Sequence, residues 1–314
     1  TMIKDYHKIP ILIIIYNRDR YLDNLISVLK KIKPQKIYIA ADGPNSSENQ
    51  KKCEITRKKI EKLITWECDI KKKYRNKNVG CKVNINKGLD WFFSNEKMGI
   101  ILEDDCDPSE SFFDFCKELL IKYEDIKKIK MISGNFYYEK LVNDENIKNS
   151  YFFSKRPGTH GWATWRRAWI QNNQNMDGWN KFNGFVWLFI FFNFNFVKSH
   201  YFFKKLNDSY TNKIKSWDYQ LLYSIWKNDG LIIRPYKHLC KHIGWGNEAT
   251  HSKHVDTFPD LKKKEIYSTL IHPKKIIYDD FFDKIEDNTL RKLKFFSYLA
   301  YKIKNNYIIK KIIN

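Results

Sequence analysis

Apolar runs alternate with amphipathic segments through the first 125 residues, and this alternation constrains the fold more than any other feature. The runs predict strands at 11–15, 36–41, 81–85 and 99–102, and a basic loop lies at 71–77. Apolar residues at helical spacing predict helices at 21–32, 48–65, 86–92 and 109–124. Regular strand–helix alternation is typical of an α/β protein with a mostly parallel sheet flanked by helices, a Rossmann-like arrangement. Farther along, strands are predicted at 130–134 and 231–235, and a helix at 215–228.

Polar side chains follow each of the four early strands at the point where the strand ends. In open parallel sheets, ligands bind outside the carboxyl ends of the strands. We therefore expect one ligand crevice lined by these residues: Asn17, Arg18, Asp42, Gly43, Lys87, Glu103, Asp104 and Asp105.

The three adjacent acids Glu103, Asp104 and Asp105 need a specific explanation, because neighbouring carboxylates repel each other. They are compatible with a bound Mg²⁺ or Mn²⁺, which prefers oxygen ligands and completes its shell with substrate phosphates and water. The alternative is an acidic helix N-terminus capped by Asp107 or Ser109. The preceding strands favour the metal–phosphate interpretation.

Composition limits the classes of partner. The net charge is +21, from 57 Lys and Arg against 36 Asp and Glu, which favours polyanions or reflects a general Lys, Asn and Ile bias. The six cysteines form no C-x-x-C pair, so we expect a reducing cytoplasm. A zinc site at His238, Cys240 and His242 is disfavoured for the same reason.

Missing motifs exclude several functions. The sequence has no P-loop and no G-x-G-x-x-G, which argues against P-loop hydrolases and dehydrogenases. A sugar-nucleotide pyrophosphorylase is a weaker alternative, because residues 16–18 contain no glycine. A non-enzymatic nucleic-acid-binding protein is the other alternative, but its basic residues are spread and no RRM, KH or zinc-finger pattern occurs, so we expect no nucleic-acid partner.

Five segments together resemble a known family. Residues 100–105 look like the acidic metal motif of GT-A glycosyltransferases, in the Glu-Asp-Asp form of the N-acetylglucosaminyltransferase I family. Further pieces resemble that family in the same order, at 41–43, 157–162, 217–218 and 234–235, the last followed by Gly246 and His251. The match spans about residues 8–255. Two departures are an extra residue between Gly158 and Gly161, and Tyr219 in place of a second acid.

The resemblance implies a GT-A fold, an activity and a set of roles. The activity is inverting, metal-dependent transfer from a nucleotide-diphosphate sugar, such as UDP-GlcNAc or another UDP-sugar. The acceptor would be a hydroxyl of a bacterial cell-surface glycan or a lipid-linked acceptor. Asp105 would bind Mn²⁺ or Mg²⁺, Asp104 the ribose, and Glu103 would face the donor sugar. Asp218 would be the general base, with Glu248 or Asp229 as substitutes. Donor contacts would come from Asn17, Arg18, Asp42, Gly43, Lys87, Trp162 and His251, with core packing the alternative for Trp162.

The domain prediction divides the chain into a glycosyltransferase domain at 1–270 and a basic amphipathic tail at 271–314. Within the domain, 8–135 would bind the nucleotide sugar and 136–270 the acceptor. The tail carries lysines between apolar residues from Leu290 onward, which suggests peripheral contact with an anionic membrane at its inner face. The apolar stretch 185–196 is too short to span a bilayer, so we expect a buried or interfacial segment.

Overall fold

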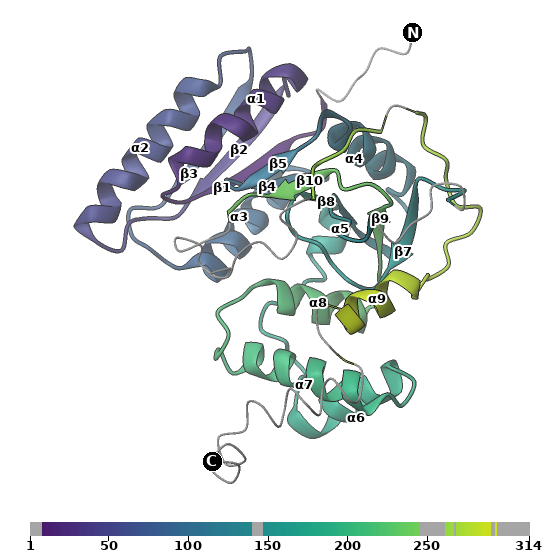
Figure 1. Cartoon of the computed structure of the whole chain (residues 1–314). Coiled ribbons are helices and arrows are strands. Elements are labelled where there is room, and N and C mark those ends of the chain that lie inside the picture. The colour runs from purple at the N-terminus through teal and green to yellow at the C-terminus, as the bar shows by residue number, and fades with distance from the viewer. Residues whose placement is uncertain (1–7, 140–146, 245–260, 267, 290–292, 294–314) are drawn as a thin grey trace, which may run out of the picture.

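The computed structural model describes residues 8–139, 147–244, 261–266, 268–289 and 293. Its centre is an eight-stranded sheet in the order β3-β2-β1-β4-β8-β6-β9-β7 (Figure 1). The strands, in that order, are Asp69–Tyr74, Lys36–Ala41, Ile11–Ile15, Met98–Glu103, Trp162–Trp165, Ile129–Ser133, Leu231–Pro235 and Tyr151–Ser154. A two-stranded sheet joins β5 (Cys106–Pro108) to β10 (Cys240–His242).

The sheet is mostly parallel. Strands β3, β2, β1 and β4 all run parallel, and β6 runs parallel to β9. Strand β8 is antiparallel to both of its neighbours, and β7 is antiparallel to β9. The predicted fold class, an α/β protein with a mostly parallel sheet flanked by helices, is therefore confirmed.

Helices cover both faces of the sheet because its central strands are apolar on both sides. Alternate residues of β1 point in opposite directions. Ile11, Ile13 and Ile15 pack in one core with α1 (Leu22–Ile32), α2 (Ser47–Leu63) and α4 (Glu110–Lys122). Leu12 and Ile14 pack in a second core with α3 (Cys81–Asn95), α7 (Phe196–Tyr210) and α8 (Asp218–Lys227). The remaining helices are a 3-10 turn at Asp19–Tyr21, α5 (Arg166–Trp169), α6 (Lys181–Phe191) and α9 (Phe281–Thr289).

Two sequence predictions were wrong in the segment between β2 and β4. The basic loop predicted at 71–77 overlaps the second half of the edge strand β3, and the strand predicted at 81–85 forms the first five residues of α3. Strand β3 has a single neighbour and solvent on its outer side, so lysines are tolerated there and the apolar signal is lost. Residues 81–85 alternate like a strand, but Ile85 and Leu89 are buried one helical turn apart.

The sheet crosses both of the predicted domain halves, since β1 to β6 lie in 8–135 and β7 to β10 in 136–270. The first part of the predicted tail packs on this sheet through α9, whose Asp283, Glu286 and Asp287 are buried. Most of the basic residues of that tail lie outside the described residues. In the part of the chain that the structure describes, every helix is too short or too polar to cross a bilayer.

Candidate active site

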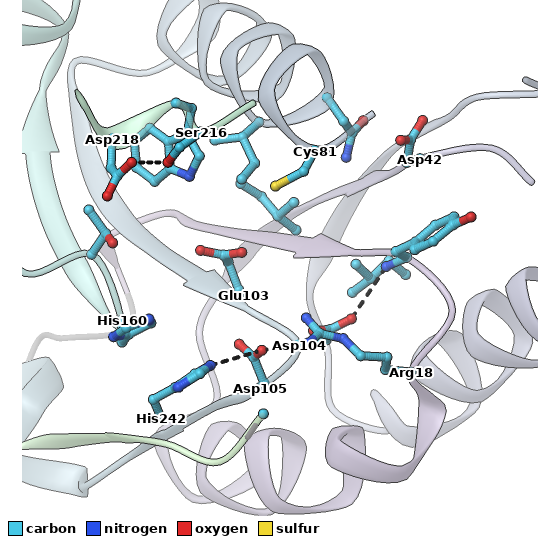
Figure 2. Close-up of a pocket in the computed structure, with 18 residues that line it drawn as sticks. Arg18, Asp42, Cys81, Glu103, Asp104, Asp105, His160, Ser216, Asp218 and His242 are labelled. Atoms are coloured by element: carbon cyan, nitrogen blue, oxygen red, sulfur yellow. Dashed lines mark hydrogen bonds and ion pairs between the residues drawn. The ribbon is translucent and has the colours of Figure 1, made fainter. Parts of the chain in front are cut away.

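The candidate site is a cavity of about 350 Å³ at the carboxyl ends of β1, β2 and β4 (Figure 2). These are the strand ends at which a ligand crevice was predicted. Six of the predicted site residues line it: Arg18, Asp42, Glu103, Asp104, Asp105 and Asp218. The structure therefore brings these six residues together in one cavity, whereas the other predicted residues do not line it.

The acidic tip stands at the end of the central strand β4. Glu103 is the last residue of β4, and the Asp104 backbone N–H donates to the Ile14 carbonyl at 3.0 Å, which extends the pairing with β1. The alternative prediction of a helix capped by Ser109 is confirmed for α4, which begins at Glu110, but the three acids precede that cap by four residues or more and lie at the end of β4. The three acids are thus held at the cavity by the sheet.

Arg18 neutralises part of this cluster from the loop after β1. Its guanidinium forms an ion pair with Asp104 and a second one with Asp105, with Nη1 and Oδ2 2.7 Å apart. The side chains of Asp104 and Asp105 are only 1 % and 6 % exposed. Because charged groups are costly to bury, removing any one of these three charges would leave the others buried without compensation and would lower the stability of the folded protein.

The three acids have different proton affinities. Burial and the Asp105 carboxylate raise the pKa of Glu103 to about 8. Burial also raises the pKa of Asp104 to about 6, against the opposing effect of Arg18. Burial acts in the same direction on Asp105, but the hydrogen bond from His242 and the charge of Arg18 hold the pKa of Asp105 below its ordinary value. Asp105 is therefore the acid that stays ionised.

Two histidines from distant segments complete the side of the cavity next to Asp105. The His242 Nε2 atom lies 3.2 Å from Asp105 Oδ2, and its ring stacks on His160 with ring centres 4.1 Å apart (Figure 2). Strand β10 brings His242 there by pairing with β5, and the Ile243 N–H donates to the Asp105 carbonyl at 2.9 Å. Burial lowers the pKa of His160 to about 3, so this ring is neutral at physiological pH.

Sequence reasoning missed both histidines as site residues. The signals were present, because His160 lies in the 157–162 segment that resembles the family and His242 was considered as a zinc ligand. His238, the third histidine of that discussion, is structural: its Nδ1 accepts from the Phe136 N–H at 3.1 Å.

The charge balance of the cavity fits a bound cation. Five carboxylates line it, and Arg18 is the one permanently charged cation among the described lining residues. Within the described residues, no group of three or more His, Cys, Asp or Glu side chains is arranged to hold a metal ion by itself. This donor set suits Mg²⁺ or Mn²⁺ held by one or two carboxylates and by substrate phosphates, and not a structural zinc ion.

Asp218 faces the acidic tip from the first residue of α8 (Figure 2). The Ser216 hydroxyl donates to its Oδ1. The preceding Trp217 lines the cavity and stacks on Trp162, with ring centres 5.8 Å apart. Trp162 itself is 1 % exposed within β8. Trp162 therefore packs in the core against Trp217, as the alternative prediction had it, and does not line the cavity.

Asp42 lines the cavity, but its carboxylate accepts hydrogen bonds from the neighbouring loop. It accepts from the backbone N–H groups of Val79 and Gly80, each at 3.0 Å, and from the Asn78 side chain at 3.1 Å. Gly43 permits this close approach, because a Cβ atom there would lie 2.4 Å from the Lys77 backbone. Asp42 and Gly43 thus shape the wall of the cavity at the start of α3.

Other predicted residues lie elsewhere. Asn17 donates from its side chain to Asn49 at 2.8 Å, outside the residues that line the cavity. Lys87 is an exposed residue of α3 that lines a different cavity of about 260 Å³. Asp229 is 73 % exposed and pairs with Lys128, so it is not at the site. His251 and Glu248 lie outside the described residues.

Comparisons with known proteins give distant likenesses only. No family model and no curated protein matches the sequence. One similar solved structure is HddC from Yersinia pseudotuberculosis complexed with GMP-PN, with 9 % identity and a TM-score of 0.29 over 51 % of this chain and 77 % of that chain. Another is 4-diphosphocytidyl-2C-methyl-D-erythritol synthase from Anaerococcus prevotii, with 12 % identity and a TM-score of 0.33 over 60 % and 85 % of the two chains.

Both matches are distant, and at such TM-scores they say nothing about the reaction. The resemblance to the N-acetylglucosaminyltransferase I family remains a prediction from the sequence motifs.

Proposed function

We propose that the protein is an inverting, metal-dependent glycosyltransferase. It would transfer a sugar from a nucleotide-diphosphate donor, a UDP-sugar such as UDP-GlcNAc, to a hydroxyl of a surface glycan or a lipid-linked acceptor. The observation that carries the proposal is the meeting of two acidic elements in one cavity. Glu103, Asp104 and Asp105 stand at the end of β4, and Asp218 faces them from α8.

The acidic tip would hold the donor. Asp105, the acid that stays ionised, would bind Mn²⁺ or Mg²⁺, and His242 would orient its carboxylate. When bound, the metal ion would neutralise the charge that develops on the diphosphate leaving group. Arg18 would remain beside Asp104, which would hold the ribose, and Glu103 would face the sugar.

Asp218 would act on the acceptor. A general base must lie within hydrogen-bond reach of the hydroxyl proton that it removes. Asp218 lines the cavity opposite the tip, and its Oδ1 already accepts a hydrogen bond from Ser216, which fixes the orientation of the carboxylate. In a single displacement the acceptor hydroxyl would attack the anomeric carbon, the bond to the diphosphate would break, and the hydroxyl proton would pass to Asp218.

Nucleotide binding with and without metal tests the donor side. UDP with Mn²⁺ should raise the melting temperature of the protein, and Asp105→Ala should abolish that increase. Asp107→Ala is the matched control, because Asp107 lies two residues away, pairs with Lys263 and does not line the cavity. Unchanged UDP and Mn²⁺ affinity in Asp105→Ala would overturn the assignment.

A panel of UDP-, GDP- and CMP-sugars, assayed for donor hydrolysis, would identify the donor. Hydrolysis of none of them, with no nucleotide-dependent stabilisation, would reject the glycosyltransferase proposal itself.

A further inference from the structure

The most unusual surface of the molecule lies on the α6–α7 hairpin, residues 181–210, which projects from the sheet beyond α8 (Figure 1). Gly184 and Leu188 of α6 face the protein and are buried. Large apolar side chains on its other side are open to solvent. They are Phe182, Val186 and Ile190, with exposed fractions of 78 %, 42 % and 58 %. A helix that is apolar all round normally lies in a protein core or in lipid.

The turn of the hairpin extends this apolar surface. Phe194 and Phe196 are 69 % and 58 % exposed. Phe194 also has a φ of +63°, a left-handed conformation that is unfavourable for a bulky residue. The backbone thus accepts strain at the position where it presents an aromatic ring to solvent. Strain of this kind is characteristic of functional segments.

The charge around these side chains indicates what covers them. The hairpin contains one acid, Asp208, near the end of α7, against four lysines, Lys181, Lys198, Lys204 and Lys205. Lys198 points inward to Asp287, at 2.9 Å, whereas Lys181 and Lys204 are exposed. The chain as a whole carries a net charge of +21. Exposed aromatic side chains on a segment with an excess of lysines fit an anionic lipid surface.

We propose that the α6–α7 hairpin docks the protein on anionic membranes. With 11 residues, α6 would be about 16 Å long, so it cannot span a bilayer and would lie in the plane of the interface. Phe182, Ile190 and Phe194 enter the boundary between headgroups and acyl chains, while Lys181 and Lys204 contact the headgroups. This inference does not depend on the proposed transfer reaction.

The hairpin is close in sequence to the candidate site. Helix α7 ends at Tyr210, and Ser216 and Asp218, which follow within eight residues, line the cavity. A membrane-bound hairpin would therefore hold one wall of the cavity near the lipid surface.

Vesicle flotation tests the proposal with the full chain. The wild-type protein should float with phosphatidylglycerol vesicles, and much less with phosphatidylcholine vesicles. The triple variant Phe182→Ser, Ile190→Ser, Phe194→Ser should bind the vesicles at least about tenfold more weakly than the wild type, because partitioning scales with the apolar area that enters the interface. Because the three side chains are exposed, the melting temperature should change little.

The control removes three apolar side chains of similar exposure elsewhere. Ile55→Ser, Ile121→Ser, Ile170→Ser changes residues that are 53 %, 56 % and 74 % exposed and lie outside the hairpin, and this variant should bind like the wild type. Three results would overturn the proposal: no flotation of the wild type, equal flotation of both triple variants, or equal binding to neutral vesicles. A wild-type protein that self-associates without binding vesicles, and a hairpin variant that does not self-associate, would instead assign the surface to a second copy.

Discussion

Arg18 offers the sharpest test of the electrostatics of the site, through the variant Arg18→Met. Methionine keeps an unbranched apolar stem of similar length but removes the guanidinium. The change eliminates the ion pairs to Asp104 and Asp105, which are almost completely buried beside an arginine that is itself 17 % exposed. Arg20→Met is the matched control, because Arg20 lies two residues away on the surface.

The expected loss can be bounded in two ways. Breaking a buried ion pair by removing one partner costs about 3–5 kcal/mol. The protein can limit this cost by protonating one carboxyl group. In the folded wild-type protein the pKa of Asp104 is raised to about 6, so protonating this carboxyl group at pH 7 costs only about 1.4 kcal/mol, at about 1.36 kcal/mol per pKa unit. We therefore expect Arg18→Met to lower the free energy of unfolding at pH 7 by about 1.4 kcal/mol if Asp104 takes up a proton, and by up to about 5 kcal/mol if it does not.

The same reasoning fixes the sign of the pH dependence. Without Arg18, the pKa of Asp104 rises further in the folded state, above the value that it has in the unfolded chain. The loss of stability is therefore full above the folded pKa and shrinks as the pH falls. At pH 5, below the pKa of about 6, Asp104 is already largely protonated in the folded wild type, so the deficit of the variant should be smaller than at pH 7.

Urea denaturation at pH 7 and pH 5, with and without Mn²⁺, measures these quantities. Mn²⁺ should stabilise Arg18→Met more than the wild type, because the ion replaces the missing positive charge. Arg20→Met should change the unfolding free energy by less than about 0.5 kcal/mol. The reasoning is refuted if Arg18→Met unfolds at the wild-type urea midpoint, or if its deficit is the same at both pH values.

Three other residues give predictions that can be measured separately. Asp218→Asn should lower turnover about 10²- to 10⁴-fold in a transfer assay, as expected for a general base, with donor affinity unchanged by calorimetry; lost affinity would contradict that role. Gly244→Ala should weaken Mn²⁺-dependent nucleotide binding in the thermal-shift assay, because its Cβ would lie 2.2 Å from Asp105 Oδ2, and wild-type binding would contradict this. Asp287→Ala should lower the free energy of unfolding by about 3–5 kcal/mol in urea denaturation, because it removes the buried carboxylate that lies 2.9 Å from the Arg156 guanidinium. Adding Arg156→Met should recover part of that loss, and a purely additive loss would show that the pair is not coupled.

The sequence predicted the central strands, and the polar residues that gather at their ends around one cavity, because both are local signals. Strands β1, β2 and β4 are continuous apolar runs that end in polar residues, and such a run can be recognised without knowledge of its neighbours. Strand β3 was missed because it is an edge strand, where lysines are tolerated, so its residues do not form the apolar run by which the other strands were recognised. The first five residues of α3 were taken for a strand because they alternate before the helical period becomes visible, whereas the helix predicted at 86–92 is its continuation.

The histidines of the site could not be placed from the sequence, because their position depends on pairing between distant segments. His160 precedes β8, which inserts antiparallel beside β4, and His242 ends β10, which pairs with β5. Residues so far apart meet only through the order of the strands, which local periodicity does not specify. Lys87 was predicted at the site because residues 81–85 were taken for a strand that ends just before it. These residues belong to helix α3, so no strand end lies there.

The two edges of the sheet are protected in different ways, with a consequence for shortened forms of the protein. Strand β3 carries Lys71, Lys72 and Lys73, and charges on an exposed edge discourage another strand from pairing with it. At the other edge, Tyr278 bridges to Phe153 of β7, and the Asp279 N–H donates to the Phe153 carbonyl at 2.8 Å. A chain cut at residue 270 would leave β7 as an uncovered, uncharged edge, and we expect it to aggregate where the longer chain stays dispersed.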